Sequence, residues 1–220
     1  MKAVTRAMPI DTRRDPRLIA VVFATVAVPH GRARHPEAAA RLADVSCRVN
    51  QLFAPALAEP FGPANGDELQ GALSDPAQTP LCVSLLREWL APTPLRVGIG
   101  IGAVESGADE SGRDPFEQAS AAVRLAERER GVTRYLGCGQ AADILVNAIC
   151  RLLDPLIMER TEKQWQAIAA YRRLGHQRTV AAELGVTRQS VGDRMAAGHR
   201  RETQEADAAI AAFLARSRWP

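Results

Sequence analysis

The sequence lacks the paired cysteines of a metal site and the long apolar run of a membrane helix. Its four cysteines, Cys47, Cys82, Cys138 and Cys150, stand far apart, and no C-x-x-C pair or histidine lies at metal-ligand spacing. This pattern indicates reduced thiols. The histidines form no constellation with a serine or cysteine, and the glycines fail the G-x-G-x-x-G spacing, so neither nucleophilic catalysis nor a dinucleotide fingerprint is indicated.

The apolar run from Leu18 to Val28 is too short to span a bilayer. It follows several basic residues, as in a signal peptide, but it begins late in the chain. We therefore predict a cytoplasmic protein with no membrane contact. The run itself is typical of a central β-strand that is buried on both faces.

A helix-turn-helix pattern is present over residues 180–195. Val180, Ala181 and Leu184 share one face of a first helix. Gly185 follows directly, and glycine takes the left-handed conformation that ends a helix without steric cost. An ordinary helical hairpin is the alternative interpretation of these residues.

Thr187 is expected to cap a second helix that begins at Arg188, with Val191 and Met195 as its buried pair. Side chains at the start of such a helix can hydrogen-bond to base edges, arginine with guanine and glutamine with adenine. The predicted DNA-binding residues of this helix and its cap are Thr187, Arg188, Gln189, Ser190, Asp193 and Arg194.

Positive charge is concentrated at the same end of the chain. Residues 161–220 contain ten Lys and Arg against six Asp and Glu, whereas the first 160 contain 18 against 19. Arginines near phosphates release counterions and raise affinity. The arginines around the motif, which we expect to face only Glu183 and Asp193, are Arg172, Arg173, Arg178, Arg188, Arg194, Arg200 and Arg201. Of these, Arg178, Arg200 and Arg201 complete the predicted DNA-binding set, and a merely solvated basic face is the alternative.

The first 140 residues predict a flexible arm followed by an α+β domain. The arm covers residues 1–16, and the domain covers 17–140. Its strands and helices follow one another in ferredoxin-like order. The expected elements are a strand at 18–28, a helix from 36, strands at 58–64 and 69–73 around the Asn65-Gly66 turn, a helix at 79–90, a strand at 95–102, a helix at 115–130 and a strand at 134–136.

A connecting helix and an all-α domain are predicted to follow. The connecting helix covers 141–160, and a capping box of Thr161 with Gln164 begins the helix-turn-helix domain at 161–220. The connecting helix carries one apolar stripe made of Ile144, Leu145, Ala148, Leu152 and Leu156. The first helix of the all-α domain is expected to bury Trp165, Ile168 and Ala169. A last amphipathic helix, with Ala206, Ile210, Phe213 and Leu214, packs either on its own domain or on a partner chain.

Several segments resemble the SatD family of bacterial proteins. They are residues 66–71, 97–102 and 116–122, together with Thr161-Glu162-Lys163-Gln164-Trp165 and the helix-turn-helix. The similarity covers about residues 18–214. It implies a palm domain similar to those of nucleotide and diguanylate cyclases, joined to a DNA-binding domain similar to region four of sigma factors.

The resemblance implies a likeness to active palm enzymes, in which two carboxylates hold two divalent cations. One carboxylate lies at the end of the first strand, and the other lies at the hairpin tip. Asp67 and Glu68 are the candidate metal ligands at the hairpin. The first strand has Ala24 and Thr25 where an aspartate is expected, and neither replaces a charged ligand. A two-metal enzyme is therefore not predicted, and a solvated turn is the simpler interpretation of the two hairpin carboxylates.

We predict a sequence-specific transcriptional regulator that binds double-stranded DNA as a homodimer. Its palm-like domain is not an enzyme and serves for dimerisation or for sensing a small-molecule or nucleotide effector; no cofactor is predicted, with Mg²⁺ or a nucleotide as the alternative ligand. The alternative function is a metal-dependent nucleotide cyclase or nucleotidyl transferase that uses Asp67, Glu68 and a further carboxylate such as Asp114 or Glu105. In a third alternative the C-terminal domain contacts RNA polymerase or another protein.

Overall fold

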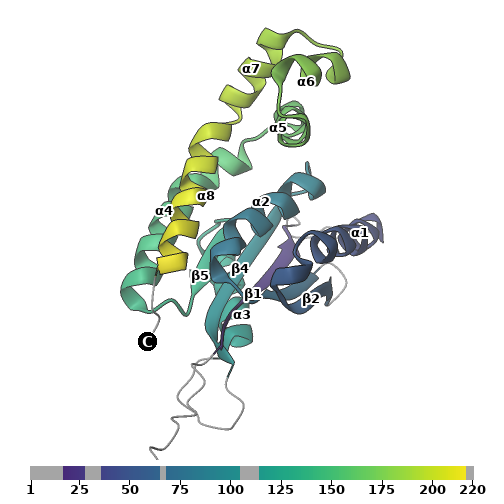
Figure 1. The fold of residues 1–220 in the computed structure, drawn as a ribbon. Coiled ribbons are helices and arrows are strands. Elements are labelled where there is room, and N and C mark those ends of the chain that lie inside the picture. Colours follow the sequence, from purple (N-terminus) through teal and green to yellow (C-terminus); the bar gives the residue numbers. More distant parts are fainter. Residues whose placement is uncertain (1–16, 28–35, 65–67, 105–113, 217–220) are drawn as a thin grey trace, which may run out of the picture.

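The computed structural model describes residues 17–27, 36–64, 68–104 and 114–216. The predicted arm, the Asn65-Gly66 turn and Asp67 lie outside these ranges. The described chain forms an α+β body on a single sheet with a helical part beyond it, which confirms the predicted fold class (Figure 1). Among its helices, none combines the length and apolar character that a bilayer span requires.

One five-stranded sheet forms the body. In spatial order its strands are β2 (Leu57–Pro63), β3 (Glu68–Leu73), β1 (Arg17–Val26), β4 (Leu95–Val104) and β5 (Thr133–Leu136). β1 is antiparallel to both of its neighbours, and β4 is parallel to β5. The first four strands therefore have the predicted ferredoxin-like order, and the short fifth strand extends the sheet.

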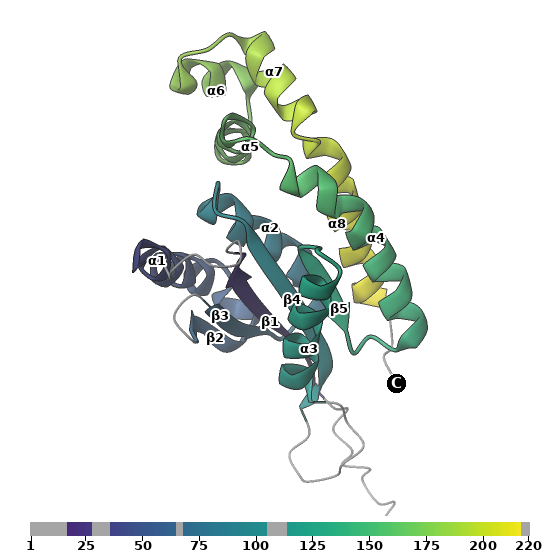
Figure 2. The same ribbon diagram turned by 180° about the vertical axis from the view of Figure 1, so that it is seen from behind.

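Helices cover both faces of the sheet. α1 (Pro36–Leu52) and α2 (Thr79–Leu90) lie on one face, and the short 3-10 turns η1 (Ala54–Ala56) and η2 (Pro76–Gln78) precede β2 and α2. α3 (Pro115–Arg128) lies on the other face, where it makes the crossover that a parallel strand pair requires (Figure 2).

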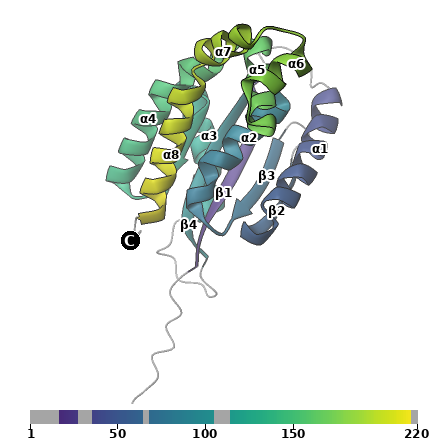
Figure 3. The ribbon, with the colours of Figure 1, turned by 45° about the horizontal axis from the view of Figure 1, so that its top comes forward.

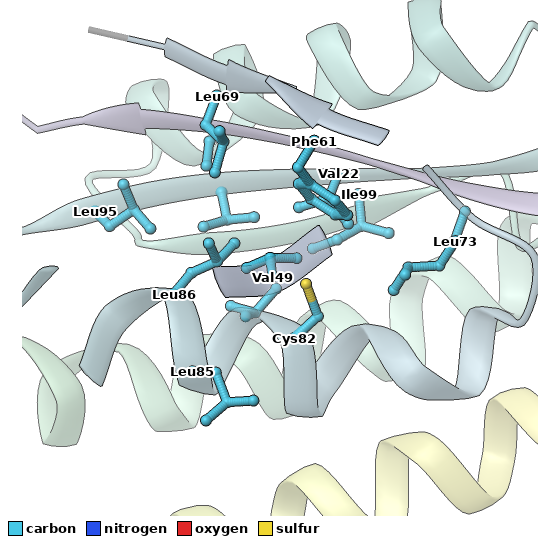
Figure 4. Close-up of a cluster of buried hydrophobic side chains, with 14 of the residues drawn as sticks. Val22, Val49, Phe61, Leu69, Leu73, Cys82, Leu85, Leu86, Leu95 and Ile99 are labelled. Atoms are coloured by element: carbon cyan, nitrogen blue, oxygen red, sulfur yellow. The ribbon is translucent and has the colours of Figure 1, made fainter. Parts of the chain in front are cut away.

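β1 is apolar from Leu18 to Ala24 because both of its faces are covered. Ala20, Val22 and Ala24 belong to the large cluster under α1 and α2, whereas Ile19 and Val21 pack beneath α3. All five residues are at most 3% exposed. Figure 4 shows the larger cluster, in which side chains from strands and helices interdigitate. The continuous apolar run predicted this double burial correctly.

Two glycines of β4 allow α3 to lie directly on the sheet. A Cβ atom on Gly98 would collide with the backbone of Ala119 and Val123, and one on Gly100 with the backbone of Pro115 and Ala119. Glycine at such positions marks the close approach of another backbone. Helix packing therefore explains the alternating glycines without a phosphate ligand.

α4 (Gln140–Met158) covers the edge of β5. The side chain of Asn147 accepts a hydrogen bond from the Tyr135 N–H at 2.8 Å and donates one to the Tyr135 carbonyl at 2.7 Å. Both residues are buried. These bonds pair an edge whose backbone groups would otherwise lack partners in the sheet.

The apolar stripe predicted for α4 faces outwards. Ile144, Leu145 and Leu152 are 63%, 49% and 75% exposed, Ala148 is also exposed, and Leu156 is half-buried. The buried side of the helix consists of Val146, Asn147, Cys150, Leu153 and Asp154. The spacing identified a real helical face, but the hydrogen bonds to β5 turn the opposite face inwards.

The helical part consists of α5 (Glu162–Leu174), α6 (Gln177–Leu184), α7 (Arg188–Ala197) and α8 (Arg200–Arg216). α8 returns to the body and runs beside α4 (Figure 3). Its Ile210 and Leu214 join the large cluster of the body, and its Asp207 accepts a hydrogen bond of 2.5 Å from the Ser84 hydroxyl. The last amphipathic helix thus packs against the N-terminal body of its own chain.

Candidate nucleic-acid interface

α5, α6 and α7 form a small unit at the end of the molecule away from the sheet (Figures 1 and 2). α5 begins at the predicted capping box. The Thr161 N–H donates to the Gln164 side chain at 2.9 Å, and the Gln164 N–H donates to the Thr161 hydroxyl at 3.4 Å. The helix ends at Gly175, whose φ of 75° is left-handed.

The turn between α6 and α7 has the predicted geometry. Gly185 is left-handed, with φ 64° and ψ 33°, and its N–H donates to the Ala181 carbonyl. The Val186 N–H donates to the same carbonyl at 3.0 Å. Thr187 is extended, and its hydroxyl accepts a hydrogen bond of 3.1 Å from the Ser190 N–H. The glycine stop and the threonine cap are both confirmed.

A small apolar cluster holds the three helices together. Val180, Ala181, Val191 and Met195 are buried, as the sequence predicted, and Leu184 is half-buried. On α5 the buried residues are Ala167, Ile168 and Ala170. Of the three residues predicted to be buried on this helix, only Ile168 lies on the face that packs against α6 and α7.

Trp165 and Ala169 were expected in that face but are only half-buried. The Arg160 guanidinium lies 4.7 Å from the centroid of the Trp165 ring. The ring lines the space between the helical unit and the body. Helical spacing alone did not distinguish this side of α5 from the side that faces α6 and α7.

Most of the predicted DNA-binding residues are accessible. The exposed ones are Arg178, Thr187, Arg188, Gln189, Asp193 and Arg201, and the half-buried ones are Ser190, Arg194 and Arg200. Among the described residues no carboxylate pairs with Arg178, Arg188 or Arg194. Arg188 makes only a long hydrogen bond, 3.4 Å, to the side chain of Gln177. These three cations are therefore available to phosphates or bases.

Two other arginines of the unit are already paired, which corrects the expected charge pattern. Arg172 donates to Glu88 of α2 at 2.7 Å, and the Glu88 side chain is only 5% exposed. Arg173 donates to both carboxylate oxygens of Glu183, at 2.5 and 2.6 Å. The positive charge left for a ligand is consequently centred on α7 and the start of α6.

Arg200 and Arg201 lie beyond the end of α7 and differ from each other. The Arg200 guanidinium lies 4.5 Å from the centroid of the Tyr171 ring, on the inner side of the unit. Arg201 is exposed and pairs with Glu205 at 3.6 Å. The inward position of Arg200 had no signal in the sequence, because its partner ring belongs to a different helix.

The described part of the hairpin tip contributes one carboxylate, that of Glu68. Glu68 is half-buried, its Oε2 atom has no hydrogen-bond partner among the described residues, and Thr25 lies opposite it on β1. No group of three metal-ligating side chains gathers within the described ranges, which leave out Asp67 and Glu105. Asp114 is engaged as the N-cap of α3. A threonine cannot supply the missing charge.

No protein-family model matches the chain, and no curated protein matches it. Among solved structures, the crystal structure of a regulator of polyketide synthase expression from Bifidobacterium adolescentis aligns with it at 11% sequence identity and a TM-score of 0.30. The alignment covers 92% of this chain and 82% of the other. At this score the two chains share too little geometry for one to inform the function of the other, and the SatD resemblance stays a prediction.

Proposed function

We propose that this chain is a cytoplasmic, sequence-specific transcriptional regulator that binds double-stranded DNA through α7. The observation that carries the proposal is the exposed first turn of α7, which the Gly185 turn and the Thr187 cap hold at one end of the molecule. The arginines beside that turn have no carboxylate partner among the described residues. The resemblance to the SatD family agrees with this proposal.

In the proposed complex α7 enters the major groove. A helix with its side chains is about 10–12 Å across and the groove is about 12 Å wide, so α7 with its 10 residues fits into the groove and its first turns reach the bases. Arg188, Gln189 and Asp193 contact base edges, whereas Arg178 on α6 contacts a phosphate. Base contacts give the sequence preference, and the phosphate contact positions the helix.

The test begins with a fragment selected from a genomic DNA library by the wild-type protein. Arg188→Ala should weaken binding to that fragment by about 1–3 kcal/mol, or roughly 5–150-fold, with less effect on random DNA. Arg124→Ala is the matched control, because Arg124 is exposed on α3 and its removal changes the net charge equally. Fluorescence anisotropy across a salt series measures the DNA affinity of both variants. Equal affinity of the two variants contradicts the proposal.

A second copy of the chain is the proposed partner of the outer face of α4. Ala148 lies at the middle of this face, with Leu145 on one side and Leu152 on the other. In a two-fold antiparallel arrangement each leucine meets its counterpart across the small central residue. The exposed cation of this helix, Arg151, is already paired with Glu129 at 2.8 Å.

The size of this face suits a dimer. A helix of 19 residues is about 28 Å long, and two adjacent helices are roughly 20 Å wide, so α4 with α8 presents roughly 600 Å² in projection. Standard interfaces bury about 800 Å² on each partner. A two-fold dimer would also present two copies of α7 to paired half-sites.

Sedimentation velocity tests this dimer. Leu152→Glu should give monomers at concentrations where the wild type is dimeric, because it places an unpaired charge within the interface. Leu52→Glu is the control, since Leu52 on α1 is 56% exposed on another part of the surface. A dimer that survives Leu152→Glu would rule out this interface.

An enzymatic function is a second candidate because one oxygen of Glu68 is buried without a described partner. A nucleotide cyclase or nucleotidyl transferase that uses Glu68 and Asp67 would convert a nucleoside triphosphate in the presence of Mg²⁺ or Mn²⁺. Chromatography of the products after incubation with each common triphosphate tests this. Turnover that Glu68→Gln abolishes would support it, and the absence of product would reject it.

A further inference from the structure

A cleft of about 470 Å³ lies between the helical unit and the body. Leu81 and Ser84 of α2 line one wall, and Trp165 and Tyr171 of α5 line the other. Asp207 of α8 lies beside Ser84, from which it accepts a hydrogen bond. Small-molecule sites typically have volumes of roughly 300–1,000 Å³ and often lie between domains. The cleft therefore has the size and the place of a ligand site.

The charge in the cleft is unbalanced. Three arginines line it, Arg160, Arg172 and Arg200, against the single carboxylate of Asp207. Burial lowers the pKa of Arg160 to about 10, and the cations of Arg87 and Arg172 act in the same direction. Burial also raises the pKa of Asp207. A bound anion would relieve this excess of positive charge.

Arg200 is the arginine free to bind such an anion. Arg172 is paired with Glu88, and Arg160 donates hydrogen bonds to the Gly198 carbonyl and the Thr203 hydroxyl, where α7 is connected to α8. The Arg200 guanidinium has no hydrogen-bond or ion-pair partner among the described residues, and its central carbon lies over the Tyr171 ring, 4.5 Å from the ring centroid. Its N–H donors are therefore not used by carboxylates or carbonyls of the described residues, and they remain available to a ligand.

The remainder of the lining is largely apolar. It includes Ala77, Pro80, Leu81, Ile168, Ala208 and Ala211. Leu81 is 47% exposed, so its apolar side chain is accessible to a ligand. The cleft thus offers an apolar wall next to one free cation.

We propose that this cleft binds a small amphipathic anion, with a carboxylate or phosphate group on Arg200 and a flat apolar body against Leu81 and Ala208. The Arg160 side chain, which also lines the cleft, donates to the Gly198 carbonyl at 2.6 Å, where α7 ends. A ligand that touches Arg160 and both walls binds one orientation of α7 better than others, and so changes DNA affinity. This coupling rests on the proposed DNA binding, whereas the site itself does not.

Two fluorescent probes test the site on the full chain. One is 8-anilinonaphthalene-1-sulfonate, and the other is N-phenyl-1-naphthylamine, which has the same ring system without the anionic group. The sulfonate should bind once per chain and at least about tenfold more tightly than the neutral probe, as expected for one charge-assisted contact. Equal affinities would overturn the proposal. Displacement by 1-naphthoate or by 1-naphthyl phosphate identifies which anionic group the site prefers.

Two variants locate the probe. Arg200→Gln should reduce the affinity for the sulfonate about tenfold and leave the neutral probe unchanged. Ala208→Phe fills the cleft from an exposed position and should block both probes without disturbing the core. Leu52→Gln, on α1 and outside the cleft, is the control and should change neither affinity. If the control removes binding or the two cleft variants retain it, the cleft is not the site.

The coupling is measured separately with the DNA fragment selected above. Saturation with the sulfonate should change the affinity for that fragment at least threefold in the wild type and not in Arg200→Gln. Probe binding with unchanged DNA affinity would overturn the coupling and leave the site. Probe binding to a chain that binds no DNA would overturn the proposed function instead.

Discussion

In the N-terminal body, buried side chains come from elements that lie far apart in the sequence. Val22 of β1, Leu86 of α2 and Leu214 of α8 belong to one cluster. In the helical unit α5–α7 the cluster comes from three consecutive helices, and three of its seven buried members are alanines. Alanine buries little apolar surface, so less stabilisation comes from packing in the unit than in the body.

The helical unit compensates for its small core by local and anchoring interactions. Two of its helices, α5 and α7, begin after Thr161 and Thr187, whose side chains accept hydrogen bonds from backbone N–H groups. The Arg172–Glu88 pair and the hydrogen bonds of Arg160 tie it to the body and to the start of α8. The body thus depends on close packing over long sequence distances, and the unit depends on caps and a few polar anchors.

The largest expected effect is on the close packing of the body. Gly100→Val should destabilise the protein by about 3 kcal/mol or more, because a Cβ atom there collides with the backbone of Pro115 and Ala119. Gly62→Val on β2 is the matched control, since nothing lies within 4 Å of its Cβ position. Urea denaturation followed by circular dichroism measures both. Similar stabilities of the two variants would contradict the view that the body depends on close packing between β4 and α3.

A smaller effect is expected at the cap of α7. Thr187→Ala should cost about 1 kcal/mol, because the Ser190 N–H loses its acceptor. Hydrogen exchange should show faster opening of α7 while the strands of the body keep their protection. Thr179→Ala, within α6 and exposed, is the control. Equal loss of protection in the body and α7 would show that the two regions unfold as one.

A gain is expected within α7. Gly192→Ala should stabilise the protein by about 0.5–1 kcal/mol, because glycine inside a helix is costly relative to alanine. The nearest atom to the new Cβ would be the Gln177 side-chain nitrogen at 3.9 Å. A thermal melt measures the gain. A loss of stability would mean that α7 packs as tightly as β4 and α3 do.

The smallest effect concerns pH. The hydrogen bonds of Arg151, followed by that of Arg134, lower the pKa of Glu129 from 4.5 to about 2 despite partial desolvation. Since the folded-state pKa is the lower one, this contribution is present above pH 4.5 and is lost as the pH falls through about 2. Glu129→Gln should flatten the fall of Tm between pH 5 and 2. An unchanged profile would show that the solvent screens these pairs completely.

The sequence predicted the elements and their order well, because periodicity and turn residues act locally. The strand of residues 18–28 is β1, and the cap at Thr187 and the stop at Gly185 lie where the pattern placed them. It also identified the helical stripe of α4. It did not indicate the direction of that stripe, because Asn147 pairs with β5 through hydrogen bonds that no spacing encodes.

The candidate interface was predictable only in part for the same reason. Arg188 and Gln189 follow a cap and a turn, so their exposure follows from neighbours in the chain. Arg172 and Arg200 contribute to the same local excess of positive charge in the sequence, but Arg172 pairs with Glu88 and Arg200 lies over the Tyr171 ring. The sequence composition does not distinguish the exposed Arg188 from Arg172 and Arg200, because the partners of these two lie on other helices.

By itself, the sequence determined the α+β class, the order of the strands and the two-helix motif with its stop and cap, since these depend on residues a few positions apart. The tertiary structure alone decided that α8 returns to the body, that the apolar face of α4 points outwards and that a cleft forms between Leu81 and Tyr171. Each of these depends on contacts between residues distant in the chain, whose free energies local patterns do not contain.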